Sequence, residues 1–333
     1  MSTYYVPQVE LQALLSGAEG ISIFASSPDA SMESLSCPRG DRSPKGFFLP
    51  AVESVGQYGP AATATETQAD PVALVGVRAC ELRARSYLDQ VLLAGDVEDP
   101  MYRRRRDRTV LVSCDCTDCA ESCFCTQVGG EPFARDGYDV NLTSVDGGFL
   151  VDVATDAGRG WLGNGRASQL AEATDDQLAR RDQLRREMTE RVANQNQGVG
   201  PYTSDRPPAL PNDGDEAWQA FAADCVECGA CTHICPTCHC FYLYDQSVEP
   251  GVFERVRTWD SCLLSTYHRM AGGVNMKLTP RPRLLSRLAN RVLHKFTYSP
   301  QQYSLVGCVG CGRCVDACVG AIDIREVVKE LGQ

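Results

Sequence analysis

The chain has 333 residues, 43% of them hydrophobic and 23% charged, which is the composition of a folded globular protein and argues against wholesale disorder. Its formal net charge of −11 argues against a basic surface that would neutralise nucleic-acid phosphates. We find no apolar run of transmembrane length and no signal peptide, so we expect a cytoplasmic protein without a membrane span. The length predicts two domains.

The first part of the chain has the pattern of an α/β fold. A helix is predicted over 9–15, and short apolar runs at 71–77 and 109–113 predict buried strands, the first of which leads into a helix. The run at 148–154 predicts one strand of a hairpin. Residues 168–195 are rich in Ala, Leu, Arg, Gln and Glu, and they predict an exposed helix.

A stretch rich in proline and glycine marks the expected domain boundary. We predict an α/β domain over 1–197, a linker over 198–216 and a mostly helical, ferredoxin-type domain over 217–333. In the first domain, GRGWLG (158–163) matches the glycine pattern of dinucleotide-binding loops. Such a loop should open a helix, whereas Trp161 and the residues after it suggest a turn, so we expect no nucleotide site there.

The unusual feature of the composition is its 18 cysteines, which are clustered rather than spread as in a disulfide framework. Two segments have the spacing C-x2-C-x2-C-x3-C of ferredoxins, in which the fourth cysteine of each motif reaches the other cluster. The spacing therefore predicts two [4Fe–4S] clusters, one held by Cys225, Cys228, Cys231 and Cys318, the other by Cys308, Cys311, Cys314 and Cys235. Zinc is the alternative, but zinc sites use two cysteine pairs rather than two quartets. Gly229 and Gly312 are expected to free the backbone near the clusters.

Further cysteines follow the two predicted strands of the α/β domain, at the carboxyl ends where open sheets place ligands. A third four-thiolate site can be assembled from Cys80, Cys116, Cys123 and Cys125. Spacing alone favours a cluster and zinc equally at this site, because both accept four thiolates. Cys114 and Cys119 are interleaved with the set, and either could take the place of one of its four members.

The remaining cysteines have two interpretations. Cys238, Cys240 and Cys262 are either an incomplete ligand set, together with His239, or buried packing thiols. Cys37 is isolated, and we assign it no role. We identify no catalytic residue, because the chain lacks a phosphate-binding P-loop, a zinc-protease motif and a nucleophile elbow.

Positive charge is concentrated between residues 261 and 300, which contain seven basic residues and no acidic one. They are Arg269, Lys277, Arg281, Arg283, Arg287, Arg291 and Lys295. This segment lies between the two ferredoxin motifs, so it could offset the negative charge of the clusters or dock an acidic partner. A solvated helical face is the third interpretation.

With these motifs together, the chain resembles the iron–sulfur β subunit of group 3 [NiFe] hydrogenases of the sulfhydrogenase type, and the related A subunit of anaerobic sulfite reductase. The segments that carry the resemblance are GFFLP (46–50), GVRACEL (76–82), residues 102–106, CTDCAESCFC (116–125), GYDVNLT (137–143), CVECGACTHICPTCHCF (225–241), TWDSC (258–262), HKF (294–296) and CVGCGRCVDAC (308–318). Ala79 and Glu81 stand where the family has proline and aspartate, and Val319 stands where proline usually follows the last cysteine.

The resemblance implies that Cys80, Cys116, Cys123 and Cys125 hold a third [4Fe–4S] cluster. It also implies an electron-transfer subunit of an oxidoreductase complex, which relays electrons between a flavin-bearing, NAD(P)H-linked partner and a catalytic subunit. The implied catalytic partner is a [NiFe] hydrogenase, with a sulfite or sulfur reductase as the alternative. A self-contained enzyme with an open cluster site is a further alternative.

Overall fold

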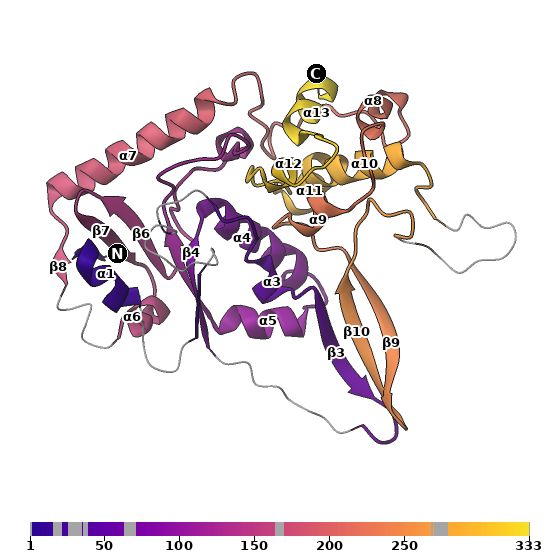
Figure 1. Ribbon diagram of the computed structural model, residues 1–333, viewed down its shortest axis with the longest axis horizontal. Helices are drawn as coiled ribbons and strands as arrows, with labels where there is room; N and C mark the ends of the chain where they lie inside the picture. The colour runs from indigo at the N-terminus through magenta and orange to yellow at the C-terminus, as the bar shows by residue number, and fades with distance from the viewer. Residues whose placement is uncertain are drawn as a thin grey trace, which may run out of the picture. The chain divides into compact units, whose positions relative to one another are not determined.

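The computed structural model describes residues 2–15, 22–25, 35, 39–62, 71–163, 170–267, 269 and 279–332 (Figure 1). Its chain forms two compact units, which we describe one at a time. The first comprises Met1–Pro44, Ala69–Gln197 and Val309–Cys311, and the second comprises Lys45–Gln68, Gly198–Cys308 and Gly312–Gln333. Cys37 lies outside the described residues. Among those described, no helix is both long and apolar enough to cross a membrane.

A seven-stranded mixed sheet forms the centre of the first unit, in the order β2-β4-β5-β6-β7-β1-β8. The strands in this order are β2 (Ser22–Ala25), β4 (Val72–Val77), β5 (Thr109–Cys114), β6 (Val140–Val145), β7 (Gly148–Val153), β1 (Ser2–Pro7) and β8 (Ala171–Glu172). Strands β2, β4, β5 and β6 are parallel, whereas β7, β1 and β8 continue the sheet in antiparallel pairs. Both predicted buried strands and the predicted hairpin are confirmed.

The first unit contains the three predicted helices and further helices that the sequence did not predict. In chain order, its helices are α1 (Gln8–Leu15), α4 (Ala79–Leu93), α5 (Pro100–Asp107), the short 3-10 helix η1 (Cys125–Val128), α6 (Asp156–Leu162) and α7 (Asp175–Asn194), of which α1, α4 and α7 are the predicted ones. The exposed helix predicted over 168–195 begins later than expected, at Asp175, because Thr174 caps it by accepting a hydrogen bond from the amide of Gln177. Strand β8 occupies part of the residues before that cap.

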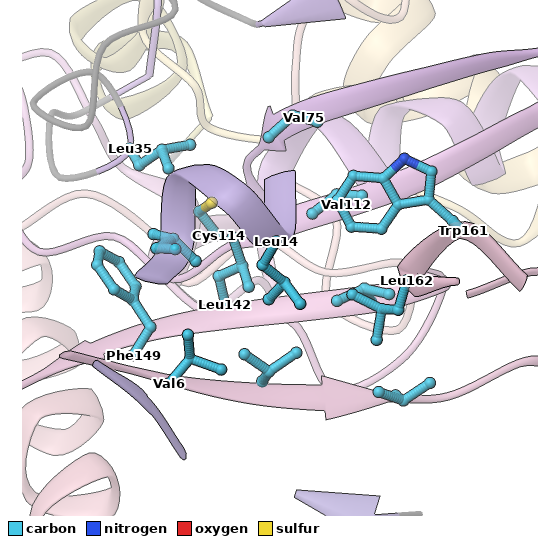
Figure 2. Close-up of a cluster of buried hydrophobic side chains, with 14 of the residues drawn as sticks. Val6, Leu14, Leu35, Val75, Val112, Cys114, Leu142, Phe149, Trp161 and Leu162 are labelled. Carbon is cyan, nitrogen blue, oxygen red and sulfur yellow. The ribbon is translucent and has the colours of Figure 1, made fainter. Parts of the chain in front are cut away.

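One hydrophobic core packs α1 and α6 against the sheet (Figure 2). Leu14 of α1 and Trp161 of α6 meet Val112 and Leu142 from neighbouring strands. The Sγ of Cys114 also lies in this core, and that residue is 2% exposed. Buried apolar side chains of this kind each stabilise the fold by about 1.5–3 kcal/mol.

The prediction of a turn at Trp161 is wrong, because residues 158–162 belong to helix α6 and Gly163 is its C-cap. The residues 164 and 165 that entered the same prediction lie outside the described residues. Thr155 caps the helix by accepting a hydrogen bond from the amide of Gly158 at 3.1 Å, and Trp161 is 1% exposed. A Cβ at Gly158 would lie 2.3 Å from the carbonyl oxygen of Asp139. That glycine therefore permits close packing of the helix on the sheet, and the helix places Trp161 in the core.

The second unit combines short helices with a separate three-stranded antiparallel sheet, in the order β3-β10-β9 (Figure 1). Its strands are β3 (Val52–Tyr58), β9 (Phe241–Glu249) and β10 (Val252–Trp259). Its helices are α3 (Lys45–Phe48), the 3-10 helix η3 (Glu216–Trp218), α8 (Gln219–Ala222), α9 (Ala230–His233), α10 (Leu284–Leu293), the π-helix η4 (His294–Tyr298), α11 (Ser299–Tyr303), α12 (Arg313–Asp316) and α13 (Ile324–Leu331). The expectation of a mostly helical domain is therefore not confirmed.

A buried ion pair joins β3 to β10 in this sheet. The Nε of Arg257 donates to the Oε1 of Glu53 at 2.9 Å, and the two residues are 5% and 8% exposed. We expect Arg257→Met to destabilise the sheet by about 3–5 kcal/mol, because it leaves a carboxylate buried without its partner. Hydrogen exchange of the β10 amides, followed by mass spectrometry, measures this loss.

The exposed ion pair between Arg255 and Asp245, on the same strand β10 and its other neighbour β9, is the matched control. Arg255→Met should leave exchange at β10 nearly unchanged, since water screens that pair. Equal effects of Arg255→Met and Arg257→Met would contradict the importance of the buried pair.

Candidate iron–sulfur centres

The two ferredoxin-type motifs fold with the same local backbone conformation. Gly229 precedes α9 with φ 71° and ψ −3°, and Gly312 precedes α12 with φ 72° and ψ −9°. Glycine adopts this left-handed conformation without steric cost, as expected for both positions. Each short helix carries the third cysteine of its motif, and α9 and α12 lie against each other. The repeat in the spacing is thus also a repeat in conformation.

Four cysteines line one cavity of the second unit, which we call the first cavity: Cys225, Cys228, Cys231 and Cys318. The structure therefore brings together three cysteines of one motif and the last cysteine of the other. The amide of Ile322 donates to the Sγ of Cys318 at 3.2 Å. The charged residue in the lining is Arg291, and apolar side chains such as Leu263 and Leu288 supply much of the rest.

The residues of the first cavity fit a [4Fe–4S] cluster. Four cysteine thiolates are the ligand set that such a cluster requires. Arg291 is 5% exposed, and its Nε has no hydrogen-bond partner among the described residues. A buried guanidinium without a counter-charge is costly, and four thiolates around iron would supply negative charge beside it.

One thiol of this cavity, that of Cys231, has a shifted pKa. Burial raises the pKa of Cys231 above its usual value, Arg291 opposes that effect, and the neighbouring Cys318 and Cys225 raise the pKa further. A thiol with a raised pKa keeps its proton near neutral pH. Metal binding here would therefore release protons.

The cysteines predicted for the second cluster are divided between the two units. Cys235, Cys308 and Cys314 belong to the second unit and Cys311 to the first. Within the second unit, Lys295 donates from Nζ to the Sγ of Cys235 at 3.2 Å and to the carbonyl of Gly307 at 3.2 Å. This lysine thus ties the end of the first motif to the start of the second. The contribution of Cys311 stays a prediction.

Three of the four cysteines predicted for the third cluster lie together in the first unit. Burial raises the pKa of Cys116, and the nearby thiols of Cys125 and Cys123 raise it further, while Arg78 opposes the shift. Burial and the thiol of Cys123 likewise raise the pKa of Cys125 to about 12. Cys80 begins its helix at the same edge of the sheet, and its approach to the other three stays a prediction.

Arg78 connects the two strand ends that deliver these cysteines. It lies between β4 and α4, is 1% exposed, and donates from Nη1 to the carbonyl of Asp115, just after β5, at 3.1 Å. Its amide also donates to the Oε2 of Glu81 at 2.8 Å at the start of α4. The sequence prediction overlooked this residue, although its position beside Cys80 was a signal.

The two interleaved cysteines differ in their surroundings. Cys114 is the last residue of β5 and packs in the hydrophobic core, where burial raises its pKa to about 11 (Figure 2). Cys119 donates from Sγ to the Oε1 of Gln195 in the residues after α7 at 3.3 Å. The burial of Cys114 in the core leaves Cys116, rather than Cys114, beside Cys123 and Cys125. Cys119 packs in the same cluster as Cys116 and Cys125.

The three unassigned cysteines of the second unit are neighbours. The pKa of Cys238 is raised by the thiol of Cys235, by burial and also by Cys240, and the pKa of Cys262 is raised by Cys240 and by burial. His239 uses Nδ1 to contact the carbonyl oxygen of Thr237 at 3.1 Å. Both interpretations of this group, an incomplete ligand set with His239 and buried packing thiols, stay predictions.

The interpretation of the basic segment as a solvated face is wrong for its last three basic residues. Arg287, Arg291 and Lys295 are 4%, 5% and 3% exposed. By contrast, Arg281 and Arg283 lie nearer the surface and form ion pairs with Asp213 and Glu216. Arg269 is exposed, and Lys277 lies outside the described residues.

Lys45 is a second buried cation that the sequence prediction missed. Its Nζ donates to the carbonyls of His233 and Cys238 at 3.1 and 3.0 Å, and it lies 4.1 Å from the centre of the Trp259 ring. Burial lowers the pKa of Lys45, while the nearby thiols oppose that shift. A lone lysine before the apolar residues of GFFLP gave no sequence signal of this role.

Comparison with known proteins agrees with this geometry. Residues 224–322, which contain both ferredoxin-type motifs, match the family model of a 4Fe-4S dicluster domain. The chain is 31% identical over 265 residues to "Sulfhydrogenase 2 subunit beta" of Pyrococcus furiosus, an alignment that covers 78% of this chain and 73% of that protein. No solved structure matches the chain significantly. The chain therefore belongs to the family of sulfhydrogenase beta subunits, as the resemblance of its motifs predicted.

Proposed function

We propose that this protein is the iron–sulfur electron-transfer subunit of a hydrogenase-type complex. The observation that carries the proposal is the first cavity, where four thiols from two distant motifs surround a space beside the buried cation of Arg291. [4Fe–4S] clusters accept and release single electrons, which is the chemistry such a subunit supplies. No substrate-binding residue is part of the proposal.

The proposed ligands of the three clusters are those predicted from the sequence. The first cavity supplies Cys225, Cys228, Cys231 and Cys318, the second set is Cys308, Cys311, Cys314 and Cys235, and the third is Cys80, Cys116, Cys123 and Cys125. The chain would hold each cluster through thiolates, and apolar side chains such as Leu263 and Leu288 line the first cavity beside its thiols. Reduced thiols on this scale suit the cytoplasm.

The proposed partners follow from the relative's name and from the resemblance. They are a [NiFe] hydrogenase subunit as the catalytic partner, and a flavin-bearing subunit that exchanges electrons with NAD(P)H. A sulfite or sulfur reductase is the alternative catalytic partner. A self-contained enzyme with an open cluster site is the further alternative, for which Cys238, Cys240 and Cys262 would supply an incomplete ligand set.

Iron content and EPR of the purified protein test the proposal. We expect about 12 iron atoms per chain and signals of three reduced clusters, because each four-cysteine site holds four irons. An EPR signal of the isolated chain that changes on addition of a small-molecule substrate would contradict an electron-transfer role. Proteins that co-purify with the chain identify the catalytic partner, since nickel indicates a hydrogenase and sirohaem a sulfite reductase.

A further inference from the structure

Three cations on one helix are buried in the second unit. Arg287, Arg291 and Lys295 recur at every fourth residue from α10 into η4, so they project from similar sides of the helix. A buried charge is costly unless an opposite charge or full hydrogen bonding compensates it. The partners of these cations therefore indicate which of them is compensated by the protein itself.

Arg287 is compensated by protein groups. It donates from Nη2 to Glu227 at 2.7 Å, and its other nitrogens donate to the carbonyls of Leu263 at 2.8 Å and Pro282 at 2.7 Å. A carboxylate and backbone carbonyls thus satisfy both its charge and its directional donors. We assign this residue to the support of the fold.

Arg291 and Lys295 have different surroundings. Among the described residues, no carboxylate forms an ion pair with either of them, and the Nε of Arg291 lacks a hydrogen-bond partner. Arg291 lines the first cavity, and Lys295 donates to the Sγ of Cys235. Both cations therefore face cysteine sulfur instead of carboxylate oxygen.

We propose that Arg291 and Lys295 are positioning residues that raise the reduction potentials of the two clusters of the ferredoxin-type motifs. The inference rests on the proposed function, since it requires that the cysteines hold clusters. Each cluster takes up one electron on reduction and becomes more negative by one charge. A fixed positive charge nearby stabilises the reduced form more than the oxidised form, and hydrogen bonds to the sulfurs act in the same direction.

Burial makes these charges effective. Attraction between charges is several-fold stronger in a protein interior than in water, and dissolved salt screens buried charges far less than exposed ones. An arginine or lysine on the surface of the same helix would lose most of its influence at high salt. The effect proposed for Arg291 and Lys295 should therefore persist when the salt concentration is raised.

The test is a redox titration of the full chain with dithionite as the electron donor, followed by EPR. We expect Lys295→Met and Arg291→Met, which keep the length of the side chain and remove its charge, to shift the midpoint potential to more negative values. The charge-conserving variants Lys295→Arg and Arg291→Lys should titrate near the wild-type potential. Arg283→Met is the matched control, because Arg283 is half-exposed at the start of the same helix and should leave the potential unchanged.

The outcomes separate this inference from the proposed function. Absence of both clusters from the wild-type chain would refute the proposed function itself. Wild-type potentials in both neutral variants, with iron content unchanged, would refute the inference alone. Loss of iron from the neutral variants but not from the charge-conserving ones would also overturn it, because the charges would then be required for assembly rather than for tuning.

Discussion

In the Cys235→Ser variant we expect the cluster of the Cys308 motif to be lost, although the substituted residue belongs to the other motif. The reason is crossed ligation, in which the fourth cysteine of each motif completes the cluster of the partner motif. Lys295 holds Cys235 beside Gly307, immediately before Cys308. The iron content should fall by about four atoms per chain, and the EPR spectrum should lose the features of two interacting clusters.

The reciprocal variant is the control for this experiment. Cys318→Ser should remove the cluster of the first cavity, to which Cys318 contributes, and should leave the cluster that uses Cys235. The two variants should therefore lose different EPR signals. If Cys235→Ser retains the signal that depends on Cys308, the crossed assignment is wrong.

The second large effect concerns the choice between two neighbouring cysteines in the first unit. Cys116→Ser should abolish the third cluster, because it removes one of the thiols gathered beside Cys125. Cys114→Ser should retain that cluster while destabilising the fold by about 1–3 kcal/mol, because it places a hydroxyl in an apolar core. Iron analysis and thermal unfolding followed by circular dichroism measure the two effects separately.

Cys114→Ser is the control for Cys116→Ser. Both variants replace cysteine by serine, so the chemical difference between the two side chains is the same at both positions. Cys119→Ser is a second control, which should retain the third cluster, since Cys119 contacts Gln195 and is not part of the proposed ligand set. Retention of the third cluster in Cys116→Ser together with its loss in Cys114→Ser would mean that the wrong thiol was chosen.

The spacing of the cysteines predicted the local backbone geometry of the two motifs, because the spacing itself limits the conformations that the loop can adopt. Two-residue gaps require a tight loop, and Gly229 and Gly312 adopt the conformation that this loop needs. Spacing could not decide between Cys114 and Cys116, because residues two apart in an extended strand point the same way. The choice depends on where the strand ends, and β5 ends at Cys114.

Two features were beyond sequence reasoning for a physical reason. Charged residues at every fourth position are predicted to share one face of a helix. A charged face is expected to be solvated unless an opposite charge lies inside the fold. The cysteine thiols beside Arg291 and Lys295 come from segments that are distant in the sequence. No local sequence pattern therefore shows that these thiols lie next to the two cations. Strand β9 is exposed along its whole length, and it therefore lacks the alternation of apolar and polar residues that identifies a half-buried strand.

The proposed ligation of each cluster by the fourth cysteine of the other motif has a consequence for the biosynthesis of the protein. Cys225, Cys228 and Cys231 leave the ribosome long before Cys318, since β9, β10 and α10 are translated between them. With the proposed ligands, a chain that stops short of the last motif can complete neither of these two clusters. Completion of these two clusters then follows synthesis of the last motif, and a nascent chain would expose its first three thiols until that motif has been made.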